Sequence, residues 1–294
     1  MVSGAGSVLA WEGLLEGGAA APQSSPQSEQ AQSSQSSEPP DAEISEKEVD
    51  YRPAFADAYE DYPKRMTSEC NGKPRVSDLL PCFWGEEGAA KTIALVGGSH
   101  AAQWITPVLE GAESAGANVV SYTMNSCTFG DVRSMSQDFY PACKEWNDAL
   151  LAVLLADPPD LVVMVATRFV DGQEEFPEGY RTYIQALTDA GIPVLGVRDN
   201  PKLPHKAPAC VETKGAEACA VPREEVYGPL ADLGLPQLSL FTFLDLSGVY
   251  CRADVCPMVQ GDVLIYRDSA HLTETWVGEN GWPVAEAVRS ALAD

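Results

Sequence analysis

The sequence predicts an α/β domain built on a doubly wound, mainly parallel five-stranded sheet with flanking helices. From residue 91 onward, short apolar runs alternate with longer amphipathic segments at the spacing typical of strands and crossover helices. The runs are apolar almost throughout, as strands covered on both faces must be. The chain has 294 residues. Roughly 230 to 245 are left once a polar N-terminal segment is set aside, which is the size of one α/β domain.

Hydrophobic periodicity and helix-ending residues define the predicted elements. The five predicted strands span residues 91–97, 118–124, 160–166, 192–197 and 238–244. Predicted helices span residues 101–115, 143–156 and 178–190, with one or two more between 273 and 294. Gly116 ends the first helix, Gly191 ends the third, and Asn280 with Gly281 separates the last two. A short strand is also predicted at 263–267.

The first 50 residues differ in composition from the rest of the chain. Between Pro22 and Pro40, Ala31 is the only apolar residue apart from the prolines, so this stretch has almost nothing to bury. Such a segment cannot offset the entropy of ordering, and we expect residues 1–50 to form a disordered, acidic, Ser/Gln/Pro-rich tether. Residues 51–90 predict an irregular lead-in that packs on the domain formed by 91–294.

The charge of the chain limits its partners. The formal net charge is −24, and residues 1–50 contribute −8 of it through nine acidic residues and Lys47. The acidic remainder argues against nucleic acid and anionic membrane surfaces, because both attract basic patches. The N-terminus has no basic segment and is a poor signal peptide, and no run of about 18 apolar residues exists.

Eight cysteines fall into four neighbouring couples. The couples are Cys70 and Cys82, Cys127 and Cys143, Cys210 and Cys219, and Cys251 and Cys256. An even number in loop regions fits structural disulfides, and nearest-neighbour pairing is the simplest of about 105 connectivities. Structural zinc is the disfavoured alternative, because no CxxC pair exists and the chain has three histidines. Disulfides indicate an extracytoplasmic location, so we expect a piece of a longer protein whose upstream part carries the membrane segments.

The stretch LVGGSH ends the first predicted strand. It lacks the GxxxxGK[ST] phosphate loop, the GxGxxG dinucleotide pattern and the final glycine of a GxSxG nucleophile turn. Taken alone, Ser99 is therefore explained more readily as a helix N-cap than as a nucleophile. Ligands of doubly wound sheets nevertheless bind at the carboxyl ends of strands, where Ser99 lies. We expect neither a cofactor nor a metal here.

A second stretch, DSAHLT near the C-terminus, supplies the groups that a serine nucleophile needs. A hydroxyl is activated by a base, most often a histidine that a carboxylate orients. Asp268 and His271 are three residues apart at a predicted helix start, so one turn presents both to the same face. His205 lies in a proline-rich loop, and we expect His100 to point away from Ser99. The sequence therefore predicts a catalytic set of Ser99, His271 and Asp268.

Together, GGSH near the start of the sheet and DSAHLT near its end resemble the SGNH (GDSL-like) hydrolase superfamily. They are most similar to the extracytoplasmic SGNH domain fused to membrane acyltransferase family 3 proteins, over residues 65–294. The first sequence motif of that family usually reads GDSH, so Gly98 in place of the aspartate is a departure. The resemblance implies a flavodoxin-like sheet, disulfide-braced loops, and a Ser99–His271–Asp268 triad that handles an acyl ester.

The middle sequence motifs of the superfamily match this chain less well. Many members use a glycine after the second strand and an asparagine after the third as oxyanion donors. Here Asn125 and Ser126 follow the second predicted strand, and Thr167 and Arg168 follow the third. We expect an oxyanion hole formed by the Ser99 backbone N–H and a group near Asn125, with Arg168 donating to the oxyanion or binding substrate. A surface or salt-bridging arginine is the alternative.

The aromatic residues divide into two groups. Trp104, Trp146 and Trp276 occupy helix-face positions, and we expect them in the core rather than as platforms for sugars. Phe169 and Phe176 follow the third predicted strand, and we expect them to line a substrate cleft.

The resemblance implies an extracytoplasmic O-acyltransferase that moves an acyl group, expected to be acetyl, through an acyl-serine at Ser99. The implied acceptor is a hydroxyl of a glycan or glycolipid, and an upstream membrane acyltransferase domain would deliver the acyl donor. The same residues would form a carbohydrate O-acetyl esterase if water were the acceptor. Gly98 and the missing asparagine motivate another alternative, a non-catalytic glycan-binding domain.

Overall fold

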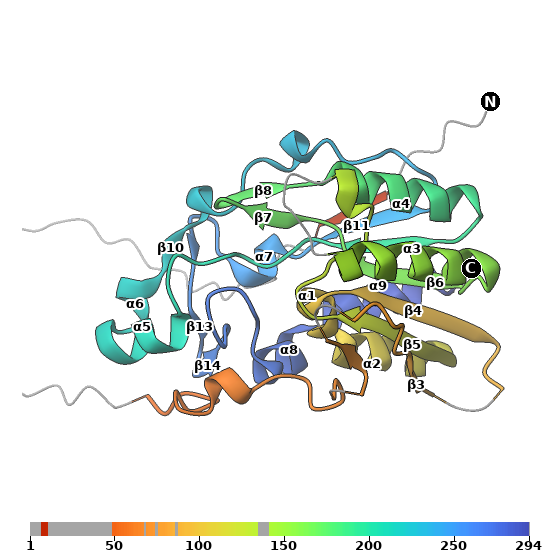
Figure 1. Cartoon of the computed structure of the whole chain (residues 1–294). Helices are drawn as coiled ribbons and strands as arrows, with labels where there is room; N and C mark the ends of the chain where they lie inside the picture. The colour runs from red at the N-terminus through yellow and green to blue at the C-terminus, as the bar shows by residue number, and fades with distance from the viewer. Residues whose placement is uncertain are drawn as a thin grey trace, which may run out of the picture.

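A computed structural model of the chain describes residues 7–10, 49–67, 69–73, 76–85, 88–134 and 141–293 (Figure 1). Within these residues, eight strands form one sheet in the order β1-β11-β9-β6-β4-β5-β2, and β3 also pairs with β5. The strands of this sheet are β1 (Ser7–Ala10), β2 (Asn71–Gly72), β3 (Cys82–Trp84), β4 (Lys91–Gly97), β5 (Ala117–Met124), β6 (Leu161–Val165), β9 (Val194–Val197) and β11 (Phe241–Asp245). All neighbouring pairs are parallel except β3 with β5. The predicted α/β fold with a mainly parallel sheet is confirmed.

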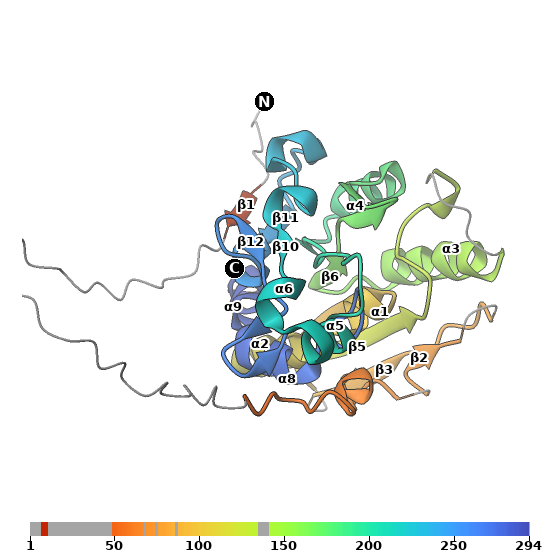
Figure 2. The ribbon, with the colours of Figure 1, turned by 90° about the vertical axis from the view of Figure 1, so that its left-hand side faces the viewer.

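Helices cover both faces of this sheet. They are α1 (Ser99–Ala102), α2 (Ile105–Ala115), α3 (Pro141–Ala156), α4 (Glu178–Asp189), α5 (Ala207–Lys214), α6 (Ala216–Cys219), α7 (Ser247–Tyr250), α8 (Glu274–Asn280) and α9 (Trp282–Ala291). Small pairs join β7 (Arg168–Val170) to β8 (Gln173–Glu175), β10 (Val221–Pro222) to β12 (Val255–Cys256), and β13 (Val259–Gln260) to β14 (Val263–Leu264). Figure 2 shows α2, α8 and α9 on one side of the sheet and α3 and α4 on the other. In the described part of the chain, no helix is both long and apolar enough to cross a lipid bilayer.

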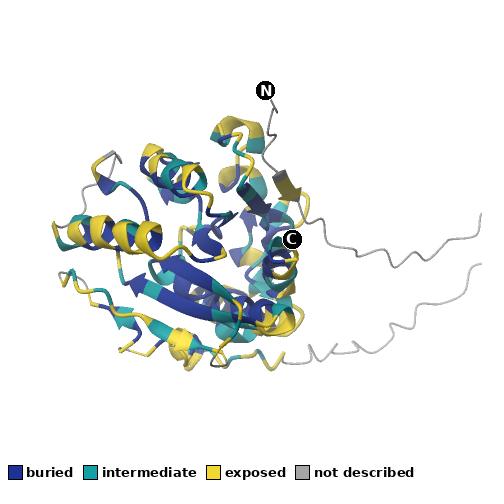
Figure 3. Cartoon of the chain, turned by 90° about the vertical axis from the view of Figure 1, so that its right-hand side faces the viewer, coloured by how far each residue is buried: buried dark blue, intermediate teal, exposed yellow. Residues whose placement is uncertain are grey.

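The apolar composition of the central strands follows from this layering. Ile93 and Leu95 of β4 belong to the core cluster that includes α2, α8 and α9. Ala94 and Val96 belong to the second cluster, which includes α3 and α4. Successive side chains of a strand point to opposite faces, so a strand covered on both sides needs an unbroken apolar run. Figure 3 shows the buried residues concentrated on the sheet and the exposed ones on the outer helix faces.

The strand order places β4 at a special position. After β4 the chain pairs β5 on one side, and it then crosses over to pair β6 on the other side. The carboxyl end of β4 is therefore a topological switch point, where ligands of open α/β sheets bind. Ser99 begins the short helix α1 directly after this end.

The five predicted strands correspond to β4, β5, β6, β9 and β11 at the centre of the sheet. Three short strands that were not predicted, β1, β2 and β3, extend its edges. Strand β1 falls within the predicted tether, and its Val8 and Leu9 are exposed while the strand pairs with β11. The strand has only four residues, and its apolar Val8 and Leu9 are followed by the polar segment that set the prediction for this region. Residues 1–6 and 11–48 of the predicted tether lie outside the described residues.

Two predicted elements differ in extent from the structure. The helix predicted at 101–115 is divided into α1 and α2, because the helix is interrupted at Gln103 and Trp104. The strand predicted at 263–267 is limited to β14, which pairs with β13 outside the main sheet. The last two helices meet at Gly281, as predicted.

The lead-in runs along the domain from residue 49 to β3. The Arg52 guanidinium pairs with Asp262 at 2.8 Å and with Glu279 at 3.0 Å. Further along, the Asp61 carboxylate accepts a hydrogen bond from the N–H of Thr275 at 3.0 Å. The segment then contributes β2 and β3 to the edge of the sheet beside β5.

All eight cysteines are paired in disulfides between neighbours in the sequence. The pairs are Cys70–Cys82, Cys127–Cys143, Cys210–Cys219 and Cys251–Cys256. The sequence separation within a pair ranges from 5 to 16 residues. Each disulfide therefore closes one short loop of the domain.

A buried ion-pair network joins three parts of the sheet's carboxyl edge. Arg198, directly after β9, pairs with Glu174 of the β7–β8 hairpin at 2.6 Å and with Asp245 of β11 at 3.1 Å. The Arg198 and Glu174 side chains are only 3% and 2% exposed. The guanidinium also lies over the Tyr227 ring, 4.4 Å from its centroid. A buried charge that loses its partner is costly, so this network holds the hairpin to the sheet.

The variant Glu174→Ala is expected to lower the free energy of unfolding by about 3 kcal/mol, because it leaves the buried Arg198 charge without its closest partner. Urea denaturation followed by circular dichroism measures the change. The exposed pair between Glu286 and Arg289 on α9 provides the control, and Glu286→Ala should have a much smaller effect. Equal losses in the two variants would contradict the assignment.

Candidate active site

Two glycines turn the chain from β4 into α1. Gly97 has φ = +138°, and a Cβ on it would lie 2.9 Å from the Cβ of Ala101. Both features favour glycine at this position. The helix N-cap is Gly98, so Ser99 is the first helical residue and not the cap. Its backbone N–H therefore has no intrahelical acceptor.

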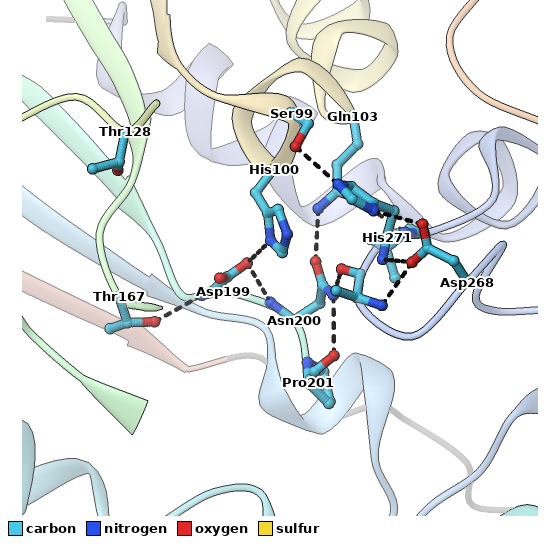
Figure 4. Close-up of polar contacts among 12 residues, drawn as sticks. Ser99, His100, Gln103, Thr128, Thr167, Asp199, Asn200, Pro201, Asp268 and His271 are labelled. Atoms are coloured by element: carbon cyan, nitrogen blue, oxygen red, sulfur yellow. Dashed lines mark hydrogen bonds and ion pairs between the residues drawn. The ribbon is translucent and has the colours of Figure 1, made fainter. Parts of the chain in front are cut away.

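The three residues predicted as a catalytic set are hydrogen bonded in series (Figure 4). Ser99 Oγ lies 2.8 Å from Nε2 of His271. Nδ1 of the same ring lies 2.8 Å from Oδ2 of Asp268. The other carboxylate oxygen, Oδ1, accepts hydrogen bonds from the N–H groups of Ala270 at 2.7 Å and His271 at 2.8 Å. The carboxylate thus fixes the conformation of the loop and the orientation of the imidazole ring.

The environment of His271 and Asp268 favours a neutral imidazole and an ionised carboxylate, the protonation states that a general base and its partner need. Burial opposes ionisation of Asp268, but the hydrogen bonds from His271 and the Ala270 N–H outweigh it and lower the Asp268 pKa well below its usual range. Burial lowers the pKa of His271, the bond to Asp268 raises it, and the nearby charge of His100 lowers it; the net effect is a decrease. The imidazole is therefore neutral, and able to accept a proton, near pH 7.

A buried amide pair clamps the loop that carries His271. Gln103 donates from Nε2 to Oδ1 of Asn200 at 2.7 Å and accepts from the N–H of Leu272 at 3.1 Å. Asn200 donates from Nδ2 to the carbonyl oxygen of Ala270 at 2.7 Å. The end of α1, the segment after β9 and the C-terminal loop are thus joined beside the triad residues (Figure 4). Neither Gln103 nor Asn200 was singled out in the sequence, because no motif marks them.

A second histidine lies in the site, contrary to the sequence-based expectation. His100 does not point away: its ring centroid is 4.8 Å from that of His271. His100 Nδ1 lies 2.7 Å from Oδ1 of Asp199, a buried carboxylate two residues after β9. Burial lowers the pKa of His100, but the interaction with Asp199 outweighs it and raises the pKa above its ordinary value. The long-range contact with Asp199, which the sequence does not reveal, turns the ring into the site.

Two cavities meet at the serine and the histidine. The first has a volume of about 430 Å³ and is lined by the ends of β4 and β6, by His100 and by Phe169. The second has a volume of about 410 Å³ and is lined partly by the lead-in, including Tyr59. Ser99 and His271 line both cavities. A larger cavity of about 690 Å³ beside α2 contains neither of them.

The side chains predicted for the oxyanion hole, Asn125 and Arg168, line different cavities. Asn125 lines the second cavity, and its Oδ1 accepts a hydrogen bond from Nδ2 of Asn71 at 2.9 Å. Arg168 lines the first cavity, at the start of β7. The structure therefore does not bring these two side chains to the same cavity. Thr167, which follows β6, accepts a hydrogen bond from the N–H of Asp199 at 2.9 Å.

The predicted aromatic residues separate as follows. Trp104, Trp146 and Trp276 are buried in the core, as expected. Phe169 lines the first cavity. The prediction for Phe176 is wrong: it belongs to the core cluster beneath α4, because the β8–α4 connection turns its ring towards Phe241.

One group of potential metal ligands occurs among the described residues, away from Ser99. It consists of His205, Cys210 and Cys219. Both sulfurs belong to a disulfide, so neither is a thiolate ligand.

The close approach of a neighbouring loop explains Gly98. A Cβ on Gly98 would lie 2.2 Å from the carbonyl oxygen of Cys127. The Gly98 backbone is extended, with φ = −97°, so this contact and not the backbone conformation demands glycine. Cys127 is held in place by its disulfide to Cys143 and by a turn in which its N–H donates to the Met124 carbonyl at 3.1 Å. An aspartate side chain at this position would collide with the loop.

A doubly wound sheet with a serine, histidine and aspartate bonded in series at its switch point places the chain among SGNH-type α/β domains. A comparison with protein families matches residues 69–277 to the SGNH domain (fused to AT3 domains). This match spans more than half of the sequence, and the chain therefore belongs to that family.

A solved structure with the same fold is the periplasmic domain of a lipopolysaccharide acetyltransferase from Salmonella ser. Paratyphi A. The two structures superpose with a TM-score of 0.54 and 12% sequence identity, over 80% of this chain and 98% of that chain. At this identity the similarity shows a shared fold. No curated protein sequence matches the chain significantly.

The variant Gly98→Ala is expected to lower the free energy of unfolding by about 1 to 3 kcal/mol, because the added methyl group overpacks against the Cys127 carbonyl. Gly278 in α8 is the matched control, since a Cβ there meets no atom within 4 Å. Gly278→Ala should raise stability by about 0.5 to 1 kcal/mol. Urea denaturation measures both changes, and a stabilising Gly98→Ala would refute the steric explanation.

Proposed function

We propose that this chain is an extracytoplasmic O-acyltransferase domain that transfers an acetyl group to a glycan or glycolipid hydroxyl through an acyl-serine at Ser99. The observation that carries the proposal is the hydrogen-bonded series of Ser99, His271 and Asp268 where two cavities meet. The family supports acyl chemistry, and the fold shared with the Salmonella acetyltransferase domain supports a glycolipid acceptor.

In the first half-reaction, Ser99 Oγ attacks the carbonyl carbon of the acyl donor while His271 Nε2 takes the hydroxyl proton. The tetrahedral intermediate collapses, the bond to the leaving group breaks, and the leaving group takes the proton from His271. Ser99 is left as an acyl ester and the imidazole is neutral again. Asp268 holds the tautomer in which Nδ1 carries the proton, and it stabilises the transient imidazolium.

In the second half-reaction, the acceptor hydroxyl gives its proton to His271 Nε2 and attacks the acyl-serine carbonyl. The ester bond to Ser99 breaks, and Oγ takes the proton back. The acyl group has then moved from donor to acceptor without an external cofactor. Water in place of the acceptor gives hydrolysis, which is the esterase alternative.

The oxyanion needs donors that point to where charge develops. The backbone N–H of Ser99 at the start of α1 is one such donor. We assign the second to the side-chain amide of Asn125, which lines the cavity shared by Ser99 and His271. Arg168 lines the opposite cavity, so we assign it to binding of the acyl donor rather than to the oxyanion.

Two observations support the proposed cellular setting. Four disulfides are typical of proteins in oxidising compartments outside the cytoplasm. The family consists of SGNH domains fused to AT3 domains, which supports an upstream membrane domain as the source of the acyl donor and as the anchor of this domain.

The variant Ser99→Ala is expected to lose at least about 10³-fold in kcat for hydrolysis of 4-nitrophenyl acetate, because no other group replaces the nucleophile. Absorbance at the nitrophenolate band measures the rate. Ser114→Ala, an exposed serine in α2, is the control and should retain full activity. A fluorophosphonate probe should label Ser99, identified by peptide mass mapping.

Full activity of Ser99→Ala would overturn the acyl-serine mechanism. Absence of both labelling and turnover in the wild-type chain would favour the non-catalytic glycan-binding alternative. Mass analysis of products with an added oligosaccharide separates transfer from hydrolysis.

The pH profile tests the role of His271. Its neutral form is required, and its lowered pKa predicts that kcat/KM falls only below the ordinary histidine value of about 6.5. Asp268 raises this pKa, whereas the charges of His100 and Arg267 lower it. His100→Gln removes one of those charges, so the acid limb should move to higher pH. A wild-type limb above pH 6.5, or a shift to lower pH in the variant, would contradict the assignment.

A further inference from the structure

The second cavity carries positive charge in a protein that is acidic overall. The chain contains 43 acidic residues against 19 lysines and arginines. Among the described residues that line this cavity, none is acidic, while Lys73 and Arg267 each bring a positive charge. A cationic cavity in a strongly acidic protein concentrates anionic ligands.

Neither cation is in an ion pair with another described residue. Within the described part of the chain, no carboxylate forms an ion pair with Lys73 or Arg267. Arg267 Nη1 donates to the backbone carbonyl of Tyr59 at 2.9 Å, which orients the guanidinium beside the cavity. A fixed guanidinium is suited to pairing with a carboxylate or phosphate group.

Aromatic side chains complete this wall of the cavity. Tyr59 and Tyr62 are 63% and 42% exposed, unusually high for large aromatic residues in a folded domain. The Arg267 guanidinium lies 5.6 Å and 5.7 Å from their ring centroids, which holds the two rings together. Exposed tyrosines present an apolar ring face and a polar hydroxyl, and this combination suits the mixed surface of a sugar.

Amide groups lie at the inner end of the same cavity, next to Ser99. Asn71 and Asn125 are hydrogen bonded to each other at 2.9 Å, and both line the cavity. Asn71 Oδ1 in turn accepts from the Thr123 hydroxyl at 3.1 Å, which fixes the position of the pair. Oriented amides are suited to hydrogen bonding with sugar hydroxyls.

The first cavity offers different chemistry. Phe129, Val165 and Phe169 line it, so one of its walls is apolar. Its charged lining residues are Arg168, Lys202 and Asp199, and the Asp199 carboxylate is paired with His100. An apolar wall fits an acyl group. Because Ser99 and His271 line both cavities, a ligand in either cavity can reach the same nucleophile and base.

We infer that the second cavity is the acceptor subsite and that it binds a sugar unit carrying an acidic group, a carboxylate or a phosphate. This assignment rests on the proposed acyl transfer and deepens it by naming the acceptor class. Arg267 and Lys73 pair with the acidic group, Tyr59 and Tyr62 contact the ring, and the acceptor hydroxyl is directed towards His271.

The experiment measures equilibrium binding of three saccharides to the full chain, by titration calorimetry, with no acyl donor present. The probes are trigalacturonate, mannose 6-phosphate and uncharged galactotriose. At least one acidic probe is expected to bind at least tenfold more tightly than galactotriose, and its affinity should fall as salt rises. Tight binding of only one acidic probe identifies the carboxylate or the phosphate as the recognised group.

Variants locate the binding. Arg267→Gln and Tyr62→Ala should each weaken binding of the acidic probe at least tenfold. If either variant fails to fold, Lys73→Ala provides the same test at an exposed position. The matched controls are Arg252→Gln and Phe83→Ala, exposed residues that line neither cavity, and both should bind as the wild type does.

Three outcomes would overturn the inference: equal affinity for acidic and neutral probes, binding of none of them, or wild-type affinity in the folded cavity variants. Fluorophosphonate labelling of Ser99 is scored separately on the wild-type chain. Labelling without selective binding rejects the acceptor subsite and keeps the acyl-serine. Selective binding without labelling keeps the saccharide site and rejects the transfer.

Discussion

The Asp268 carboxylate makes the interaction on which the rest of the site depends. One oxygen accepts from the N–H groups of Ala270 and His271, and the other faces His271 Nδ1. The first pair of bonds shapes the loop, and the third sets the tautomer, so that Nε2 faces Ser99. A single negative charge therefore controls backbone geometry, ring orientation and basicity together. Removing it would disturb all three, even though the carboxylate does not touch Ser99.

A buried polar network fixes the position of this loop relative to the sheet. Gln103 and Asn200 are 4% and 1% exposed, and burying their amides is costly unless their polar atoms are hydrogen bonded. Their partners come from the end of α1, the segment after β9 and the C-terminal loop. Because these bonds form together only in one arrangement, the network specifies a single relative position for three distant segments.

The features that sequence patterns predicted are those with a local signature. Apolar runs marked the five central strands, because both faces of the sheet are covered by helices. Ser99 was detectable at a strand end, and Asp268 and His271 through their spacing. The features that were missed depend on contacts between distant segments. Asp199 reaches the site because β9 lies beside β6, next to β4 in the sheet, and it turns His100 into the cavity. Strand β1 has only four residues, and its pairing with β11, more than 230 residues away in the sequence, is a contact that a local pattern does not show.

The second cavity is built from two separate sources. Its catalytic end comes from the sheet and the C-terminal loop, whereas Tyr59, Tyr62 and Lys73 come from the segment before the sheet. Those three side chains are exposed or partly exposed, so substitutions there change the cavity with little effect on the core. The cavity wall and the catalytic residues can therefore evolve separately. Substitutions in this wall change the residues that contact a ligand and leave Ser99, His271 and Asp268 in place. When the ligand that the domain recognises changes during evolution, substitutions are thus expected in the lead-in before they are expected around Ser99.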